Sequence, residues 1–447
     1  MTQEGASVTW ESLDIYISAY SGITKVRRLL HIAEHFDALR IPAYKLALST
    51  LEAESLDTAT YEVIMEKLKS CDSSEQLDTT WLRTSSKKAT AITDKLEQEL
   101  KAYKNNLIKE SIRMGQQDIA NHYVNTGDLT SALRALVRNR DYCTTPLHIF
   151  QVNMGIINIS ILLGNWAQVQ SYVAKVENMS AQLKEKSAAQ NHINVASALA
   201  LLSQKKYKDA ADLLLQVDAS IESTYNNIIA MNDIANYTSL LALATFPRDD
   251  ILKLSDSASF TPFLELEVAS REALTAFHRN RYAKCFRLLD SIKPNMLADI
   301  YFAPHVEEIY TLIKERSMLL FIGAFKVISL DRISNVFDMP MEAVRDSLAS
   351  LIMREKLPTS KIDMRRVLVV NEGKVPRQSV YQKAFDVSNH YAEEVERSLF
   401  HLAVVKAGLQ VESATIKPPS RSKQFIGASK GNHIIEESED IDMMEIA

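Results

Sequence analysis

One five-residue motif in the sequence has the residue types and spacing to bind a catalytic metal. His31-Ile32-Ala33-Glu34-His35 matches the H-x-x-E-H pattern of inverted zinc peptidases, and on a helix its two histidines would lie one turn apart. Such a site also needs a further carboxylate ligand and a substrate cleft. Arg27, Arg28 and Arg40 are close in sequence and would repel a cation. The competing interpretation is a partly buried histidine pair on one helix face.

Other signatures of catalysis are missing from the sequence. It holds no H-x-H motif of a metal isopeptidase, no phosphate-binding loop, no G-x-G-x-x-G and no G-x-S-x-G. Cys71, Cys143 and Cys285 form no zinc-binding pair, and small apolar packing is the ordinary role of such cysteines. We therefore predict no catalytic residue, no metal site and no cofactor, and a reducing location in the cytoplasm and nucleus.

Composition favours a large helical protein. The 447 residues are 46% hydrophobic, and Gly and Pro number only 11 each, which suits helices better than turn-rich sheets. The balance of 51 basic and 56 acidic residues argues against attraction of the whole molecule to nucleic acid or membranes. The longest apolar run considered is Met318 to Phe325, so we expect no membrane-spanning helix. The first ten residues do not resemble a secretory signal.

A turn recurs between residues 111 and 298. In each case a short polar turn precedes a large residue and then small residues that open a helix; the large residues are Leu129, Trp166, Tyr207 and Tyr282. The spacings are 37, 41 and 75, the last being about two periods with a candidate turn at Pro247-Arg248-Asp249. This period predicts stacked helical hairpins of the tetratricopeptide type, following an N-terminal helical region, residues 1–110. A generic helical domain is the alternative.

Residues 299–371 predict a winged helix. A helix ends near Phe321, and Ser329 can cap a short helix that follows it. Pro340 suits the start of a third helix. The predicted elements after the first helix are Leu330–Phe337, Met341–Lys356 and two strands, Ser360–Asp363 and Arg366–Val370. This order of helices and strands is that of the winged helix.

A winged helix can bind either DNA or protein. Its third helix carries three acidic and three basic residues, while Lys361, Arg365 and Arg366 in the wing could touch phosphate. Because the helix is nearly neutral, we favour protein assembly over nucleic-acid binding. We expect the last strand to lie at an exposed edge that can pair with another chain. The predicted contact residues are Val367, Leu368, Val369 and Val370.

A long helix over residues 376–411 is predicted next, with one apolar stripe repeated over three heptads. Such a stripe is too long to be buried on a small winged domain, so it predicts a partner helix. The predicted contact residues are Tyr381, Phe385, Val395, Leu399 and Leu402. Residues 412–447 predict a disordered acidic tail. This tail either is solvated or docks in a basic groove.

The order of helical repeats, winged helix and terminal helix resembles the PCI family, the scaffold subunits of the proteasome lid, the signalosome and a translation-initiation complex. Several stretches resemble the signalosome branch of that family, and the proteasome-lid branch is the next nearest. They are Tyr20-Ser21-Gly22 with Arg28-Leu29, Asp118 to Asp128 with Ala132-Leu133, Arg140 to Thr144, Asn165-Trp166, Ala242 to Phe246, Phe263 to Glu267 and Asp299 to His305.

The resemblance implies an all-α fold with a small β element: a tetratricopeptide-like solenoid, a winged helix and a long C-terminal helix. It implies a non-catalytic scaffold that assembles through winged-helix edges and a helix bundle. The signalosome removes a ubiquitin-like modifier from cullin ubiquitin ligases, with catalysis on a different subunit. The implied partners are the other signalosome subunits, with those numbered 2 and 3 as neighbours, and cullin ligases through the complex.

Overall fold

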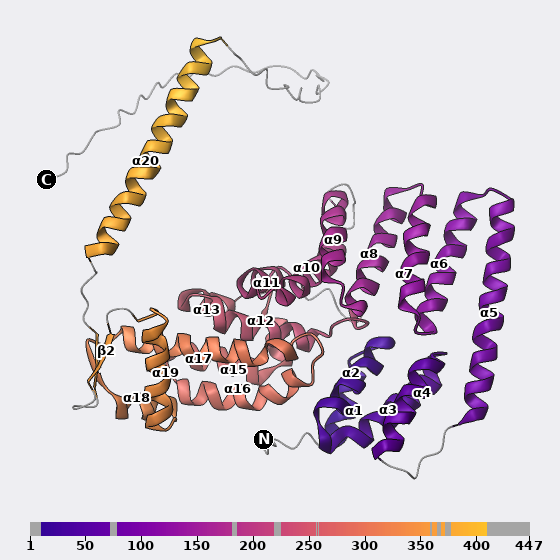
Figure 1. Ribbon diagram of the computed structural model, residues 1–447, viewed down its shortest axis with the longest axis horizontal. Coiled ribbons are helices and arrows are strands. Elements are labelled where there is room, and N and C mark those ends of the chain that lie inside the picture. Colours follow the sequence, from indigo (N-terminus) through magenta and orange to yellow (C-terminus); the bar gives the residue numbers. More distant parts are fainter. Residues whose placement is uncertain are drawn as a thin grey trace, which may run out of the picture. The chain divides into compact units, whose positions relative to one another are not determined.

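The computed structural model describes residues 10–71, 78–180, 186–218, 225–255, 257, 259–357, 360–363, 368–371 and 377–408. The chain divides into two units, Met1–Gly373 and Lys374–Ala447, which are described separately below. The predicted fold class is confirmed, because helical hairpins, a small sheet with helices and a long helix follow one another along the chain (Figure 1).

The first unit begins with four helices that enclose a hydrophobic cluster of their own. Ala33, Ala43 and Ala47 are fully buried, and these small side chains let neighbouring helices approach closely. The fifth helix leads out of this cluster, since Leu82 belongs to it and Leu100 to the next. The elements are α1 (Trp10–Ser18), α2 (Ile23–His35), η1 (Asp37–Leu39), α3 (Arg40–Glu54), α4 (Thr58–Cys71) and α5 (Thr79–Asn105).

Helical hairpins make up the middle of the unit, as predicted. The four large residues that marked the predicted turns, Leu129, Trp166, Tyr207 and Tyr282, are each the first residue of a helix. The elements are α6 (Lys109–Asn125), α7 (Leu129–Asn139), η2 (Arg140–Tyr142), α8 (Pro146–Leu163), α9 (Trp166–Ser180), α10 (Lys186–Ser203), α11 (Tyr207–Leu214), α12 (Met231–Thr245), α13 (Arg248–Ser255), α14 (Thr261–Leu266), α15 (Val268–His278) and α16 (Tyr282–Leu297).

The four turns share one backbone feature. Two positions before each of those helix starts, the residue is left-handed: Gly127 has φ 81°, Gly164 73°, Lys205 62° and Asn280 58°. A left-handed residue ends the preceding helix and lets the chain reverse. The first two turns use Gly, which adopts this conformation without strain. The last two use Lys and Asn, so the left-handed conformation cannot be recognised from a glycine in the sequence.

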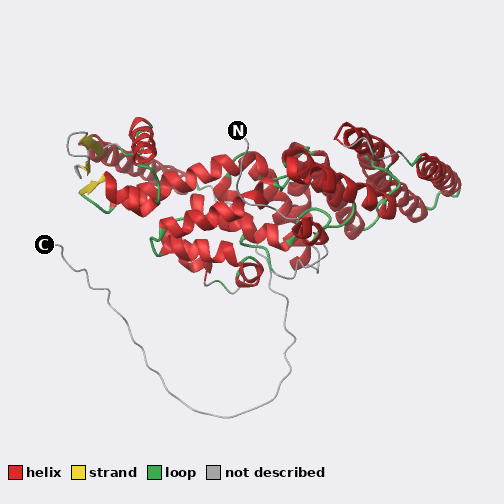
Figure 2. Cartoon of the chain, turned by 90° about the horizontal axis from the view of Figure 1, so that it is seen from below, coloured by secondary structure: helices red, strands yellow, loops and turns green. Residues whose placement is uncertain are grey.

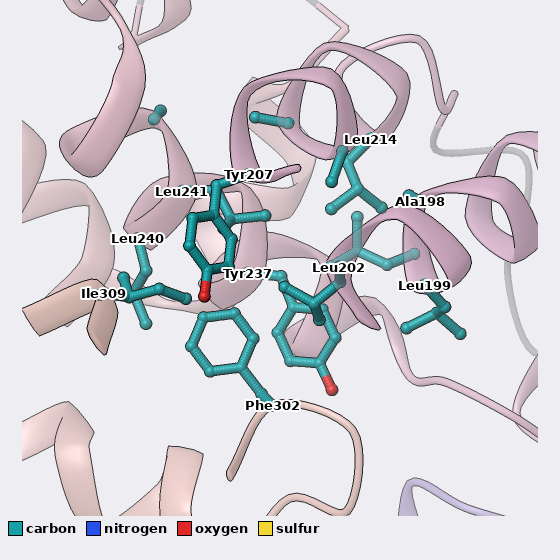
Figure 3. Packing of buried hydrophobic residues seen from close by; sticks show 14 of the residues in the cluster. Ala198, Leu199, Leu202, Tyr207, Leu214, Tyr237, Leu240, Leu241, Phe302 and Ile309 are labelled. Atoms are coloured by element: carbon teal, nitrogen blue, oxygen red, sulfur yellow. The ribbon is translucent and has the colours of Figure 1, made fainter. Parts of the chain in front are cut away.

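One continuous core runs from α5 to the small sheet. Figure 3 shows its centre, where Leu202 and Tyr207 from α10 and α11 lie near Tyr237 of α12. Tyr237 stacks on Phe302 with ring centroids 4.7 Å apart. Further on, Tyr282 of α16 stacks on Phe337 at 5.0 Å. Repeats and winged helix therefore share a core, and the predicted domain boundaries stay predictions.

Helix α8 is an exception to the expectation from the sequence. By length and composition alone it could cross a membrane, although the sequence analysis foresaw no such segment. In the structure, 44% of it is buried inside the chain. Val152, Ile156, Ile157 and Ile161 are at most 1% exposed and belong to the shared core, so packing between helices accounts for its apolar composition.

The winged helix matches the prediction in its helices and differs in its sheet. Ser329 caps α18 by accepting a hydrogen bond from the Arg332 amide at 3.4 Å, while Pro340 is the cap residue of α19 rather than its first residue. The strands lie at one end of the unit (Figure 2). The elements are η4 (Ala303–His305), α17 (Val306–Gly323), β1 (Val327–Ser329), α18 (Leu330–Phe337), α19 (Met341–Met353), β2 (Ser360–Asp363) and β3 (Leu368–Asn371).

The second unit contains one long helix, α20 (Arg377–Lys406). It forms from residues that the sequence analysis assigned to the terminal helix, and it ends five residues before the predicted limit, Val411. The predicted tail, 412–447, lies outside the described residues.

Candidate interaction surfaces

The predicted exposed edge at the last strand is wrong. The sheet has the order β1-β3-β2, so β3 is central. Val370 of β3 is opposite Val327 on one side and Lys361 on the other, and both ladders are antiparallel. No edge is left at β3 for a strand from another chain. The edges of this sheet belong to β1 and β2.

Three of the four predicted contact residues lie in the central strand of the sheet rather than at an edge. Val369 is 1% exposed and belongs to the core. The backbones of Leu368 and Val370 pair within the sheet, and Val367 lies outside the described residues. Strand β1, in which Val327 is 51% exposed, was not predicted from the sequence. Its only signal was Val327-Ile328 ahead of the Ser329 cap, too short for a period to be visible.

The apolar stripe on α20 is present and exposed. Tyr381, Phe385, Leu399 and Leu402 are 60–72% exposed, and Val395 is 38% exposed. These positions follow the helical period along one face. The stripe is wider than predicted, because further exposed apolar residues flank it, among them Val380, Val387, Tyr391, Phe400 and Val405. That these side chains contact partners stays a prediction.

The positive charges around α19 are largely neutralised inside the unit. Arg354 and Lys356 both bind Glu315 of α17, at 2.6 Å and 2.5 Å. Arg345 lies 3.5 Å from Asp346. A helix that reads DNA needs bases free to reach phosphates and base edges. The described part of the winged helix therefore lends no support to nucleic-acid binding.

The H-x-x-E-H motif is engaged in ordinary packing contacts. The rings of His31 and His35 lie 4.1 Å apart, and His31 Nε2 lies 3.2 Å from the Leu297 carbonyl. Burial lowers the pKa of His31. The Glu34 carboxylate binds Lys67 at 2.5 Å. Within the described ranges, no group of three or more His, Cys, Asp or Glu side chains is placed to hold a metal.

A buried ionic cluster that the sequence analysis missed joins the N-terminal helices to the repeats. The guanidinium of Arg28 on α2 donates to Asp233 of α12 at 2.9 Å and to Asp299, which follows α16, at 2.5 Å. Tyr20 donates to Asp233 at 2.8 Å, and its ring lies 3.9 Å from the guanidinium carbon. Spacing in sequence offers no signal for such contacts.

A cavity of about 740 Å³ lies where α2, α3 and α4 face α6, α7 and α8. Backbone contacts cross beside it, including the Leu56 amide with the Asn125 carbonyl at 3.1 Å and the Ser21 amide with the Asn226 carbonyl at 3.2 Å. The cavity therefore lies at the interface between the two hydrophobic clusters of the first unit.

Two family models match the chain. The model described as 26S proteasome subunit RPN7 matches residues 78–254, which run from α5 into α13. The PCI domain model matches residues 283–372, which include α17, α18, α19 and the sheet. The first match thus covers most of the hairpin repeats, and the second covers the winged helix.

Curated relatives match most of the chain. COP9 signalosome complex subunit 1 of Emericella nidulans is 34% identical over 89% of this chain and 83% of its own length. The protein of the same name from Arabidopsis thaliana is 33% identical over 91% of this chain and 93% of its own. The 26S proteasome non-ATPase regulatory subunit 6 of Dictyostelium discoideum is more distant, at 21% identity over 67% of this chain and 80% of its own.

Proposed function

Because the chain belongs to the family of COP9 signalosome complex subunit 1, we propose that it is a scaffold subunit of a signalosome and performs no catalytic step itself. The observation that carries the proposal is the exposed apolar stripe of α20. Burying one such side chain in a partner helix contributes about 1.5–3 kcal/mol, so several of them would hold a subunit firmly in a helix bundle.

The non-catalytic role is supported by the contacts of the motif that most resembles a metal site. Glu34, which would act as the base of a zinc peptidase, is bound to Lys67, and His31 faces a backbone carbonyl. A cofactor is not part of the proposal. The complex would remove a ubiquitin-like modifier from cullin ligases through a different subunit. Subunits 2 and 3 would be its neighbours, and it would work in the cytoplasm and nucleus.

A proteasome-lid scaffold is the second candidate. The match of residues 78–254 to the RPN7 model favours it, whereas the higher identity and coverage of the signalosome relatives favour the first. Both candidates predict assembly through α20, so a variant in that helix tests scaffolding, and the identity of the bound partners separates the two complexes.

The test is co-expression of the full chain with the other signalosome subunits, followed by purification through a tag on one of them. Val395→Asp with Leu399→Asp places two charges in the stripe, where burial without a partner costs several kcal/mol. His390→Asp with His401→Asp adds the same charge on the opposite face. We expect the stripe variant to be lost from the complex and the control to remain. Equal retention of both variants would refute scaffolding through this face.

A further inference from the structure

A basic groove lies on α5, α6 and α7 of the first unit. Its volume is about 430 Å³. Lys101 and Lys104 of α5 and Arg134 and Arg138 of α7 line it, and all four side chains are exposed. Three apolar side chains that also line it, Leu100, Ile119 and Ala135, are at most 8% exposed. The groove therefore combines charged lysines and arginines with a buried apolar floor.

These four positive charges lack a directly paired carboxylate among the described residues. Within the described ranges, none of them forms a direct ion pair with a carboxylate. Arg134 makes two 3.4 Å contacts with Thr130 and is attracted by Asp128 without pairing with it. Glu97 is the single acid among the lining residues. This differs from the winged helix, where Arg354 and Lys356 share Glu315. Free cations around a concave surface focus a positive potential there.

The surrounding sequence strengthens that potential. Residues 79–142 hold eleven Lys and Arg against seven Asp and Glu, whereas the whole chain holds 51 against 56. The segment from α5 to η2 is thus positive within an acidic chain. A positive region in an otherwise negative protein attracts negatively charged partners by long-range steering.

We propose that this groove binds a short acidic segment of another polypeptide. Its carboxylates would pair with Lys101, Lys104, Arg134 and Arg138, and one or two of its apolar side chains would rest against Leu100 and Ile119. The apolar floor favours such a peptide over nucleic acid, because a phosphate backbone offers no apolar group to pack against Leu100 and Ile119. The proposal goes beyond membership of the signalosome and does not depend on it.

The test is fluorescence anisotropy with the full chain. The probe is a labelled peptide of about twelve residues that repeats Glu-Glu-Leu. Arg134→Glu with Arg138→Glu reverses charge in the groove. Arg271→Glu with Arg279→Glu makes the same change in a smaller basic cavity on α15 and is the matched control. All four arginines are exposed, so both variants should fold; Lys101→Glu with Lys104→Glu gives a second, independent groove variant.

We expect the peptide to bind the chain and the control, with affinity at least about tenfold lower for either groove variant. A peptide with Gln for Glu should not bind. The proposal is overturned if the acidic peptide does not bind, if the control loses as much affinity as the groove variants, or if a short DNA duplex binds the groove while the peptide does not.

Discussion

Nη1 of Arg28 lies 2.5 Å from Oδ2 of Asp299, and neither side chain is exposed to solvent. The two residues are 271 positions apart, so their contact joins α2 to the segment that leads into the winged helix. Asp233 holds the other side of the same guanidinium. Buried ion pairs therefore fix the N-terminal helices to the repeats. Removing one partner of a buried pair leaves the other charge uncompensated and lowers the unfolding free energy strongly.

Replacing Arg28 by Met should destabilise the first unit strongly. Two buried carboxylates, Asp233 and Asp299, would lose their counter-charge, and breaking a buried pair typically costs about 3–5 kcal/mol. Lys67→Met is the control, because its pair with Glu34 is about half exposed and such pairs contribute about 1 kcal/mol or less. Urea unfolding followed by circular dichroism measures both. Similar losses in the two variants would contradict this account of the cluster.

The same cluster predicts a pH dependence of stability. Burial, with repulsion from Asp299, raises the pKa of Asp233 from 3.8 to about 6 despite the attraction of Arg28. The folded chain therefore holds this proton more tightly than the unfolded chain. The stabilisation is complete below about pH 4 and is lost as the pH rises through 6.

The expected size of this effect is about 3 kcal/mol at most, since one pKa unit corresponds to about 1.4 kcal/mol. Asp233→Asn should remove the slope of unfolding free energy between about pH 4 and 6 that this residue contributes. Asp37→Asn, at an exposed position, should leave the slope as it is. An unchanged slope in Asp233→Asn would rule out Asp233 as the titrating group.

Local patterns predicted the helices well, because each pattern lies within a few residues. The turn ahead of Leu129, Trp166, Tyr207 and Tyr282 marked four helix starts, and the period of the apolar residues marked the exposed stripe of α20. The Arg28 cluster could not be predicted in this way, since its partners are brought together only by the stacking of repeats.

The sheet was predicted incorrectly because one of its strands is too short to leave a pattern in the sequence. β1 has only three residues, and it runs directly into the Ser329 cap of α18, so no alternation was visible in the sequence. Without β1, the last strand was placed at an edge. With it, Val369 becomes a central and buried residue. A three-residue strand is defined by its partner rather than by its own sequence.

Two glycines of the repeated turn should respond differently to substitution by Ala. Both have positive φ, so both variants are strained by about 1–2 kcal/mol. Nothing lies near the position of an added methyl group at Gly164, whereas at Gly127 it would overlap the Asp57 carboxylate. That carboxylate accepts a hydrogen bond from the Thr60 amide at 2.9 Å, at the start of α4.

Gly127→Ala should therefore lower the unfolding free energy by more than Gly164→Ala, by about 1 kcal/mol or more for the lost cap. Urea unfolding of the two variants measures the difference. Adding Asp57→Ala to each should remove that difference. Equal destabilisation of the two single variants would show that the Asp57 contact has no energetic role.

The cysteines should differ sharply in reactivity. Cys71 is exposed, while Cys285 is buried, and burial raises the pKa of Cys285 to about 12. Because the thiolate is the reactive form, a thiol reagent should label Cys71 in the native chain and reach Cys285 only after unfolding. Cys71→Ser should remove the fastest phase, while the partly buried Cys143 should react more slowly. Fast labelling of Cys285 in the native chain would contradict its place in the core.

Native mass spectrometry of the complex that co-purifies with the full chain tests the central claim most directly. The scaffold account predicts an assembly that contains the other signalosome subunits and falls apart, or forms without this chain, when residues from Lys374 onward are removed. An isolated chain with no bound partners would contradict the account. So would an assembly made of proteasome-lid subunits.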